Sequence, residues 1–175
     1  MNKKIDFVIL WVDGNDPKWQ AEKNKYTPSW QQDTRAQRYR EWDNLKYWFR
    51  GVEKFAPWVN NIYFVTWGHL PKWLNTSHPQ LKIVNHEDFM PVQYLPTFNC
   101  NPLELNFHRI QGLEEQFVYF NDDTFIISPL RETDCFKKGK PCDSAALNVH
   151  CIEMNYGFNY ANMQATGIIK KYFDF

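Results

Sequence analysis

One short acidic segment carries the residue types best suited to chemistry. It follows directly on the apolar run 117–120, as expected where a buried strand ends, and consists of Asn121, Asp122 and Asp123. Two neighbouring carboxylates repel each other, so near low-dielectric walls such a pair tends to hold a proton or a cation. Asn and Asp are also favoured turn residues, and a plain turn that closes a hairpin is an equally good interpretation of the segment alone.

A second acidic group ends the first apolar run of the chain, residues 7–12. Asp16 followed by Pro17 is typical of an N-cap and the first residue of a helix. Gly14 stands where the backbone needs a positive φ or a close approach to a ligand. Asp13 has no such structural explanation, and we regard it as a candidate for ligand contact.

A candidate general base lies in a helix predicted over residues 102–113. Glu104 and His108 are four residues apart, so on a helix they share one face and can hydrogen-bond. The carboxylate would then fix the tautomer of the imidazole and raise its basicity. An ordinary surface pair at helical spacing is the alternative interpretation. Upstream, Arg38, Arg40 and Arg50 have fork-shaped donors that can reach phosphates, although most such arginines are solvated or paired locally.

The elements that must position these residues alternate along the chain. Apolar runs at 7–12, 61–66, 81–85 and 116–120 predict strands, and residues 125–127 are expected to continue the last strand or to pair with it. A stripe of apolar residues at three- and four-residue steps predicts an amphipathic helix over 43–55, and residues 71–74 are expected to form a short helix. His86 begins a polar cluster that either caps a helix or touches ligand, with a structural role the commoner one for a lone histidine.

This alternation predicts an α/β fold with a mainly parallel, Rossmann-like sheet flanked by helices. Ligands of such sheets bind beyond the carboxyl ends of the strands, where Asp13, Asp122 and Asp123 would converge. Hard oxygen ligands suit Mg²⁺ or Mn²⁺ bridging a diphosphate. The sequence has neither the phosphate-loop motif nor the glycine fingerprint of dinucleotide-binding folds, so those two classes are excluded.

Length and composition limit the remaining possibilities. A chain of 175 residues fits one α/β domain, residues 1–175. Lysine plus arginine and aspartate plus glutamate are equal at 20 each, so charge does not steer the chain to nucleic acid or to an anionic membrane. Aromatic residues make up 18% of the chain, including 8 Trp, which leaves some for the walls of a ligand cleft.

Cellular location is predicted from the cysteines and the apolar segments. The 4 cysteines are spaced irregularly without a C-x-x-C pair, which gives zinc binding little support and favours a reducing compartment. No apolar segment is long enough to cross a bilayer, and the amino terminus is not a signal peptide. We therefore expect a cytoplasmic protein. Because the chain stops on an aromatic segment without a polar tail, we also expect it to be incomplete at the carboxyl end.

Several motifs in one order resemble the Stealth family of sugar-phosphate transferases. Residues 5–17 resemble the first conserved region of that family. The second region is matched by a series of motifs at residues 38–58, 62–66, 71–74, 86–89, 96–99, 104, 108–110 and 119–123. The resemblance extends over roughly residues 5 to 150, and several matching motifs in one order are far more specific than any single one.

This resemblance implies a glycosyltransferase A-like fold and transfer of a hexose-1-phosphate from a UDP-sugar to a hydroxyl of a polysaccharide or glycan acceptor, with peripheral association to membrane-bound capsule machinery. It implies metal or diphosphate binding by Asp122 and Asp123, and a base at His108 oriented by Glu104. The substrate-binding residues it implies are Asp13, Gly14, Arg38, Arg109 and Asn121.

Family members continue through further conserved regions, and this chain ends before them, so the general base could lie in a missing portion.

Two other functions remain open from the sequence. A non-catalytic module that binds a nucleotide-sugar or glycan is one alternative. A metal-dependent glycosyltransferase that releases UDP rather than UMP is the other.

Overall fold

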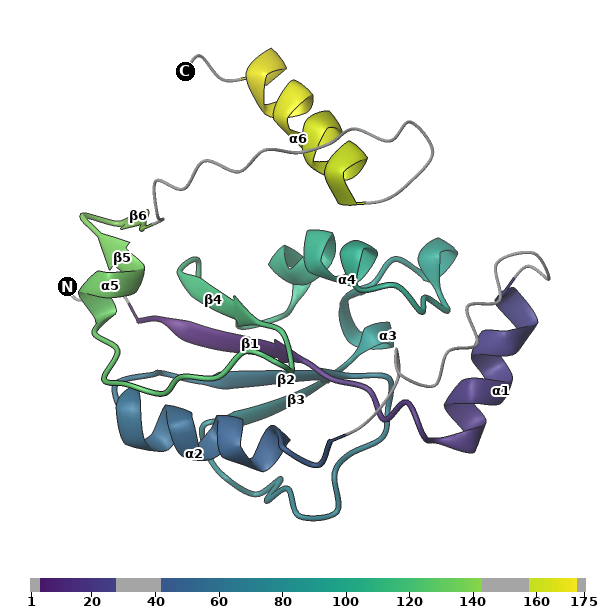
Figure 1. Ribbon diagram of the computed structural model, residues 1–175, viewed down its shortest axis with the longest axis horizontal. Helices are drawn as coiled ribbons and strands as arrows, with labels where there is room; N and C mark the ends of the chain where they lie inside the picture. Colours follow the sequence, from purple (N-terminus) through teal and green to yellow (C-terminus); the bar gives the residue numbers. More distant parts are fainter. Residues whose placement is uncertain (1–3, 28–41, 143–157, 173–175) are drawn as a thin grey trace. The chain divides into compact units, whose positions relative to one another are not determined.

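A computed structural model describes residues 4–27, 42–142 and 158–172 of the chain (Figure 1). The chain divides into two units, residues 1–142 and 143–175, and each is considered by itself. The described part of the second unit is one helix, α6 (Phe158–Tyr172). Everything that follows on the sheet and the site concerns the first unit.

The centre of the first unit is a four-stranded sheet in the order β3-β2-β1-β4. All of its neighbouring strands are parallel, which confirms the predicted α/β class. The strands are β1 (Asp6–Leu10), β2 (Ile62–Thr66), β3 (Leu81–Asn85) and β4 (Phe117–Phe120). The strand order reverses between β1 and β4, and ligands of doubly wound sheets bind outside the carboxyl ends of the strands at such a point.

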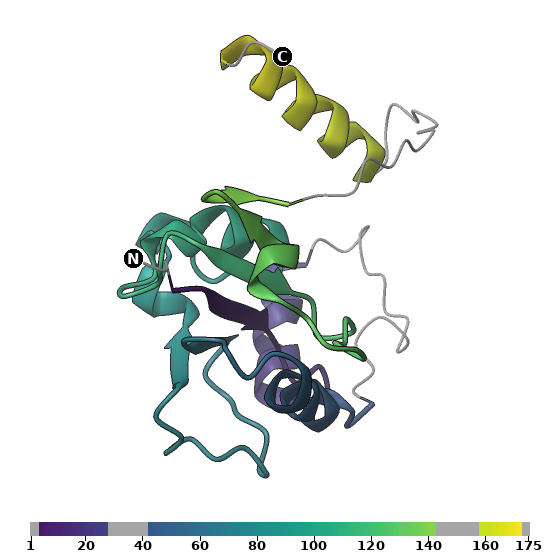
Figure 2. The same ribbon diagram turned by 90° about the vertical axis from the view of Figure 1, so that its left-hand side faces the viewer.

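Helices cover both faces of this sheet. Figures 1 and 2 show α2 (Leu45–Phe55) on one side and α4 (Cys100–Asn106) on the other. The remaining helices of the first unit are α1 (Pro17–Tyr26), α3 (His86–Phe89), α5 (Glu132–Cys135) and the 3-10 turns η2 (Val92–Tyr94) and η3 (Phe107–Arg109). A small antiparallel pair, β5 (Phe136–Lys137) and β6 (Lys140–Pro141), follows α5.

Strand β1 contributes to two separate cores, which explains the apolar run that follows its first residue. Phe7 and Ile9 face the core that contains Trp48 of α2, whereas Val8 faces the core that contains Phe107. All four of the apolar residues of β1 and α2 named here are fully buried. Alternate side chains of a strand point to opposite faces, so a strand covered on both faces needs apolar residues at every position.

Helix α2 follows its predicted amphipathic pattern. Leu45, Trp48 and Val52 are buried, and the helix ends at Phe55, shortly before Pro57. The Trp48 ring packs edge-on against Phe120, with ring centroids 5.4 Å apart. Part of the aromatic excess of the sequence is therefore core rather than ligand wall.

The carboxyl group of Asp6, the first residue of β1, is fully buried. The sequence pattern did not predict this burial. Its Oδ1 accepts hydrogen bonds from Asn60 Nδ2 at 2.7 Å and from the Asn61 backbone N–H at 3.0 Å. Its Oδ2 accepts one from the Glu114 backbone N–H at 2.9 Å. One side chain thus joins the chain segments that lead into β1, β2 and β4, and its oxygens have the partners that burial requires.

Two predicted elements are absent from the described part of the chain. The expected helix at 71–74 is a turn, in which the Leu74 N–H donates to the Pro71 carbonyl at 3.0 Å. The expected strand at 125–127 is irregular, because this segment packs on α2 instead of on the sheet edge. The Leu130 N–H donates to the carbonyl of Phe55 at 2.9 Å and fixes the end of the segment there.

The contact between this segment and α2 generates a prediction about Gly51. A Cβ at Gly51 would lie 2.7 Å from the Ile126 carbonyl oxygen, closer than real Cβ contacts allow. We expect Gly51→Ala to lower the free energy of unfolding by about 1–3 kcal/mol, although alanine is the better helix former. Urea titration measures this, with Gly167→Ala in α6 as the control, because no heavy atom lies within 4 Å of a Cβ there. Unchanged or higher stability of Gly51→Ala would contradict the packing described here.

Candidate functional site

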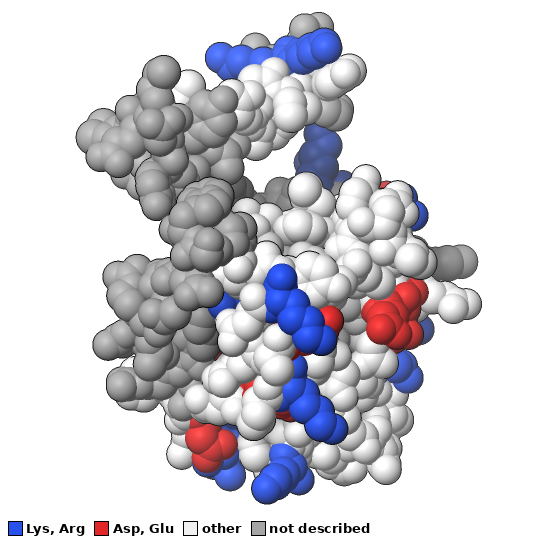
Figure 3. Space-filling view, turned by 90° about the vertical axis from the view of Figure 1, so that its right-hand side faces the viewer, with Lys and Arg blue, Asp and Glu red and all other residues white. Residues whose placement is uncertain are grey.

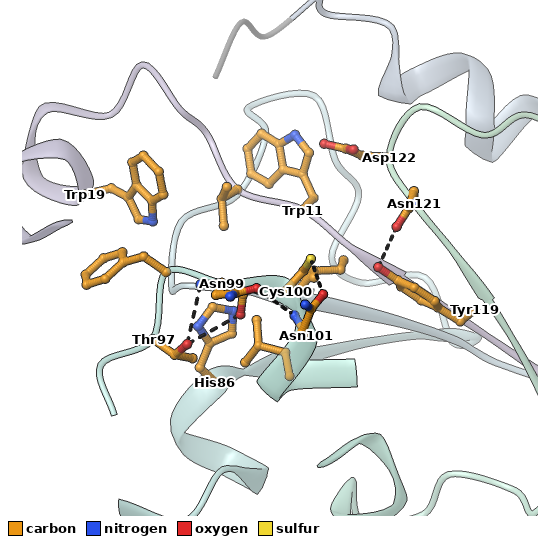
Figure 4. A pocket seen from close by; sticks show the side chains of 14 residues that line it. Trp11, Trp19, His86, Thr97, Asn99, Cys100, Asn101, Tyr119, Asn121 and Asp122 are labelled. Atoms are coloured by element: carbon orange, nitrogen blue, oxygen red, sulfur yellow. Dashed lines mark hydrogen bonds between the residues drawn. The ribbon is translucent and has the colours of Figure 1, made fainter. Parts of the chain in front are cut away.

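A cavity of about 610 Å³ opens at the carboxyl ends of β1 and β4, where the strand order reverses (Figure 4). Strand β1 and the loop that follows it, α1, α3, α4 and the end of β4 all contribute to its walls. The residues that line it are Leu10, Trp11, Val12, Trp19, His86, Thr97, Phe98, Asn99, Cys100, Asn101, Leu103, Tyr119, Asn121 and Asp122. The position agrees with the ligand site expected for an open α/β sheet.

The acidic segment after β4 forms a turn and also reaches the cavity. The Thr124 N–H donates to the carbonyl of Asn121 at 3.1 Å, which closes the turn. Asn121 and Asp122 line the cavity, whereas Asp123 does not and instead accepts a long hydrogen bond, 3.4 Å, from the Thr124 hydroxyl. The predicted turn is therefore present, but the hairpin that it was expected to close is not, because residues 125–127 form no strand.

Tyr119 fixes the orientation of Asn121. Its hydroxyl oxygen lies 2.7 Å from Asn121 Oδ1 and 3.1 Å from Glu104 Oε1, so it donates its proton to either of these acceptors (Figure 4). Burial raises the pKa of Tyr119 well above its usual range, and the nearby Glu104 carboxylate raises it further. Tyr119 therefore stays a neutral donor with a single proton, which serves either Asn121 Oδ1 or Glu104 Oε1. When it serves the amide oxygen of Asn121, the amide NH₂ group is left to donate elsewhere.

The predicted pair of Glu104 and His108 does not form. Helix α4 ends at Asn106, and His108 lies in the 3-10 turn η3, whose tighter winding removes the four-residue face that the pairing required. Glu104 accepts its hydrogen bond from Tyr119 instead, and His108 is exposed. Arg109 is exposed as well, and neither residue lines the cavity.

The loop after β1 is held by a histidine that the sequence did not single out. His69 Nε2 accepts a hydrogen bond from the Asp13 backbone N–H at 2.7 Å, and its Nδ1 lies 3.3 Å from Asp16 Oδ2. Because Nε2 accepts, the proton of the neutral ring sits on Nδ1 and is donated to Asp16. His69 thus joins the loop after β2 to the loop after β1.

Asp16 confirms its predicted role as the N-cap of α1. Its Oδ1 accepts hydrogen bonds from the backbone N–H groups of Lys18 at 2.7 Å and Trp19 at 3.1 Å. The Trp19 bond is the largest cause that lowers the pKa of Asp16, and the Lys18 bond and His69 add to it. The cap positions the first turn of α1, from which Trp19 reaches the cavity wall.

The other predicted residues of this region are placed as follows. Asp13 is half-buried and accepts a hydrogen bond from the Asn15 N–H at 2.9 Å, but it does not line the cavity. Of the two possibilities stated for Gly14, a positive φ is wrong, because the described glycines with positive φ are Gly68, Gly112 and Gly139, and a close approach to a ligand stays a prediction. Arg38 lies outside the described residues.

The side chains present fit a divalent cation only together with phosphate. Within residues 4–27, 42–142 and 158–172, no group of three or more His, Cys, Asp or Glu side chains is arranged to hold a metal. Asp122 offers one carboxylate at the cavity. Mg²⁺ is commonly bound by one or two carboxylates plus substrate phosphates, so a single carboxylate beside a diphosphate fits this ion.

His86, the first residue of α3, belongs to the polar cluster that was expected either to cap a helix or to touch ligand, but its burial was not predicted. It is only 4% exposed and lines the cavity. Neither of its ring nitrogens has a hydrogen-bond partner in the described part of the chain. Burial lowers the pKa of His86 to about 4, with a smaller effect of His69, so the ring is neutral at pH 7. Its position directly after a strand was the only available sign.

Comparison with known proteins places the chain in a family. A family model described as Stealth protein CR2, conserved region 2, matches residues 38–143, and one described as Stealth protein CR1, conserved region 1, matches residues 3–29. The chain belongs to the Stealth family. The family resemblance inferred from the sequence is thereby confirmed, and both Stealth regions line the cavity, the first through Trp11 and Trp19 and the second through His86 and Asp122.

Several proteins similar to this chain have names that refer to polysaccharides. The chain is 50% identical to the capsular polysaccharide phosphotransferase WcwK of Streptococcus pneumoniae, over 99% of this chain and 53% of that protein. It is 53% identical to the capsular polysaccharide phosphotransferase eps5J of Streptococcus thermophilus, over 78% and 59%. It is 45% identical to the receptor polysaccharide phosphotransferase WefC of Streptococcus oralis, over 97% and 52%. The chain spans about half the length of these relatives.

Two further properties of the described chain concern its helices and its surface charge. Among the described residues, no helix is long and apolar enough to pass through a bilayer. On the face shown in Figure 3, basic and acidic side chains are interspersed among larger uncharged areas, in keeping with equal totals of the two signs.

The depressed pKa of His86 predicts a pH dependence of stability. The unfolded chain takes up a proton at its ordinary pKa of 6.5, whereas the folded chain does so only at about 4. Between these values the unfolded state binds more protons, so the free energy of unfolding falls as the pH falls, by up to about 3 kcal/mol from this group. We expect His86→Phe to lose this part of the decrease.

Urea unfolding at pH 7 and at pH 4.5, for wild type and variant, measures the difference. Carboxylates also titrate in this range, and comparing the two proteins removes their common contribution. His78→Phe is the matched control, because His78 is exposed and its replacement leaves the decrease intact. The same decrease in His86→Phe as in wild type would show that His86 titrates normally.

Proposed function

We propose that this chain carries the donor-binding part of a sugar-1-phosphate transferase that acts in capsular or other exopolysaccharide synthesis. The observation that carries the proposal is the position of Asp122, which lines a cavity at the reversal of strand order that both Stealth regions build. The names of the relatives, capsular and receptor polysaccharide phosphotransferases, support the same reaction class. The donor is a UDP-sugar, and the acceptor is a hydroxyl of a polysaccharide or glycan.

The reaction is a displacement at phosphorus. An acceptor hydroxyl oxygen forms a bond to the sugar-bearing phosphorus of the donor, and the bond from that phosphorus to the bridging diphosphate oxygen breaks. UMP leaves with the bridging oxygen, the hydroxyl proton passes to a general base, and the product is a phosphodiester that retains the sugar. The proposal is therefore tested by which nucleotide is released, UMP or UDP.

The side chains at the end of β4 suit the diphosphate. Mg²⁺ or Mn²⁺ held by Asp122, with Asp123 as a further ligand, would neutralise charge on the diphosphate. When Tyr119 donates to the amide oxygen of Asn121, the NH₂ group of Asn121 can donate to a phosphate oxygen. Asp13 and Gly14 are proposed at the nucleotide, and Arg109, with Arg38, at the transferred phosphate.

The general base is the least supported role. His108 stays a prediction, and it is exposed and separated from the Glu104 that was expected to orient it. We propose a cytoplasmic protein that associates peripherally with capsule machinery at the inner face of the membrane.

Nucleotide release distinguishes the two carboxylates. With UDP-sugars, Mg²⁺ and short capsule-type acceptors, we expect UMP release that stops when the metal is chelated. Asp122→Asn should lower the rate by about 100-fold or more, as expected for loss of a group that stabilises transition-state charge. Asp123→Asn is the matched variant, and we expect a smaller loss because Asp123 does not line the cavity.

Chromatographic separation of UMP from UDP provides the measurement. Release of UDP would instead indicate glycosyl transfer without phosphate. Binding of the UDP-sugar without release of either nucleotide would indicate a binding module that lacks the general base. Full activity of Asp122→Asn would contradict the site proposed here.

A further inference from the structure

His86 is a buried titratable residue that lines the cavity, and the proposed reaction gives it no role. It begins the one-turn helix α3, which is fixed by a capping box in which the Asn85 N–H donates to Asp88 Oδ2 at 2.6 Å. His86 is buried, with only 4% of the residue exposed, and it lines the cavity. A residue held so firmly at the carboxyl end of a strand is well placed to contact a ligand.

Both nitrogens of this ring lack hydrogen-bond partners within the described residues. A neutral imidazole has one donor and one acceptor, and buried polar groups are normally paired. Two other polar residues of the cavity wall have partners of their own: the Thr97 hydroxyl donates to the Asn99 carbonyl at 3.4 Å, and Asn99 Oδ1 accepts from the Asn101 backbone N–H at 3.0 Å. Leaving a buried donor and acceptor unpaired destabilises the free protein, which a purely structural histidine would not explain.

The surroundings of His86 are uncharged and rich in flat rings. Figure 4 shows His86 and Trp19 toward one side of the cavity and Asn121 and Asp122 toward the other. Trp19 packs edge-on against Phe98, with ring centroids 5.8 Å apart, and both line the cavity. Asp122 is the only residue with a formally charged side chain at pH 7 among the described lining residues, so no lysine or arginine of the described lining lies near His86 to pair with a phosphate.

We propose that His86 is a specificity-determining residue that hydrogen-bonds an uncharged ring of the ligand, either the nucleobase or the sugar of a nucleotide-sugar whose phosphates lie toward Asp122. The inference rests on the proposed function for the identity of the ligand. The ring would fill the aromatic side of the cavity and give His86 both a donor and an acceptor. The two sources share this chemistry, and the test separates them.

Binding of UMP and of glucose 1-phosphate to the 175-residue chain, by calorimetry with Mg²⁺ present, is the experiment. His86→Phe keeps a planar ring but has no polar atom, and we expect it to weaken the binding of one probe by about tenfold, the typical effect of a lost hydrogen bond to a well-placed group. Weakening for UMP alone assigns the nucleobase or ribose to His86. Weakening for glucose 1-phosphate alone assigns the sugar.

Stability provides the second readout. If His86 is retained for binding, removing its unpaired nitrogens leaves the urea midpoint of the free chain unchanged or raises it, whereas a structural role requires a decrease. His78→Phe is the control for both measurements, because His78 is exposed and lies outside this cavity. Should His86→Phe not fold, ring ¹⁵N resonances of His86 in the wild-type chain replace it, and we expect them to shift when the bound probe saturates.

The outcomes separate the inference from the proposed function. Equal binding of both probes by wild type and His86→Phe overturns the inference alone, as do ring resonances that stay unchanged at saturation. A wild-type chain that binds neither probe overturns the proposed function together with the inference. A lowered urea midpoint with unchanged affinity would make His86 a structural residue.

Discussion

The buried carboxyl group of Asp6 is the constraint on which the geometry of the sheet depends. It accepts hydrogen bonds from Asn60, Asn61 and Glu114, which lie just before β2 and β4, while it is itself the first residue of β1. Parallel strands that start from a common anchor keep their register along their length, and a slip of one residue would turn every side chain to the other face. The register set at the amino ends of the strands therefore decides where Asp122 emerges at their carboxyl ends.

At the carboxyl ends of the strands, His69 links neighbouring segments in a similar way. It joins the loops after β1 and β2 through the Asp13 backbone and Asp16, and Asp16 in turn caps α1. Strand β1 is thus restrained at both ends by polar side chains, while its middle is held by apolar packing on two faces. Because β1 and the loop after it are restrained in this way, Trp19 and the end of β4 are held in fixed positions. A preorganised binding site requires such fixed positions.

The parts of the fold that the sequence predicted are those governed by local pattern. Strand β3 and the buried stripe of α2 were predicted because apolar spacing alone specifies them. The end of α4 was not, because Phe107 and Ile110 pack into the core as the chain tightens into η3, and tertiary packing overrides helical periodicity there. In the site, the position of Asp122 was predictable from the end of a strand. The burial of His86 was not, since it stands in a polar run beside Glu87 and Asp88.

The imidazole of His86, which has no hydrogen-bond partner among the described residues, also links occupancy of the cavity to the melting temperature. A ligand that binds only the folded chain stabilises it in proportion to the logarithm of its concentration over Kd, and one that satisfies a buried donor and acceptor removes a cost present in the free protein. Thermal shift would then rank candidate sugars and nucleotides without any assay of turnover. A library of donors could be sorted in this way even when the acceptor is unknown.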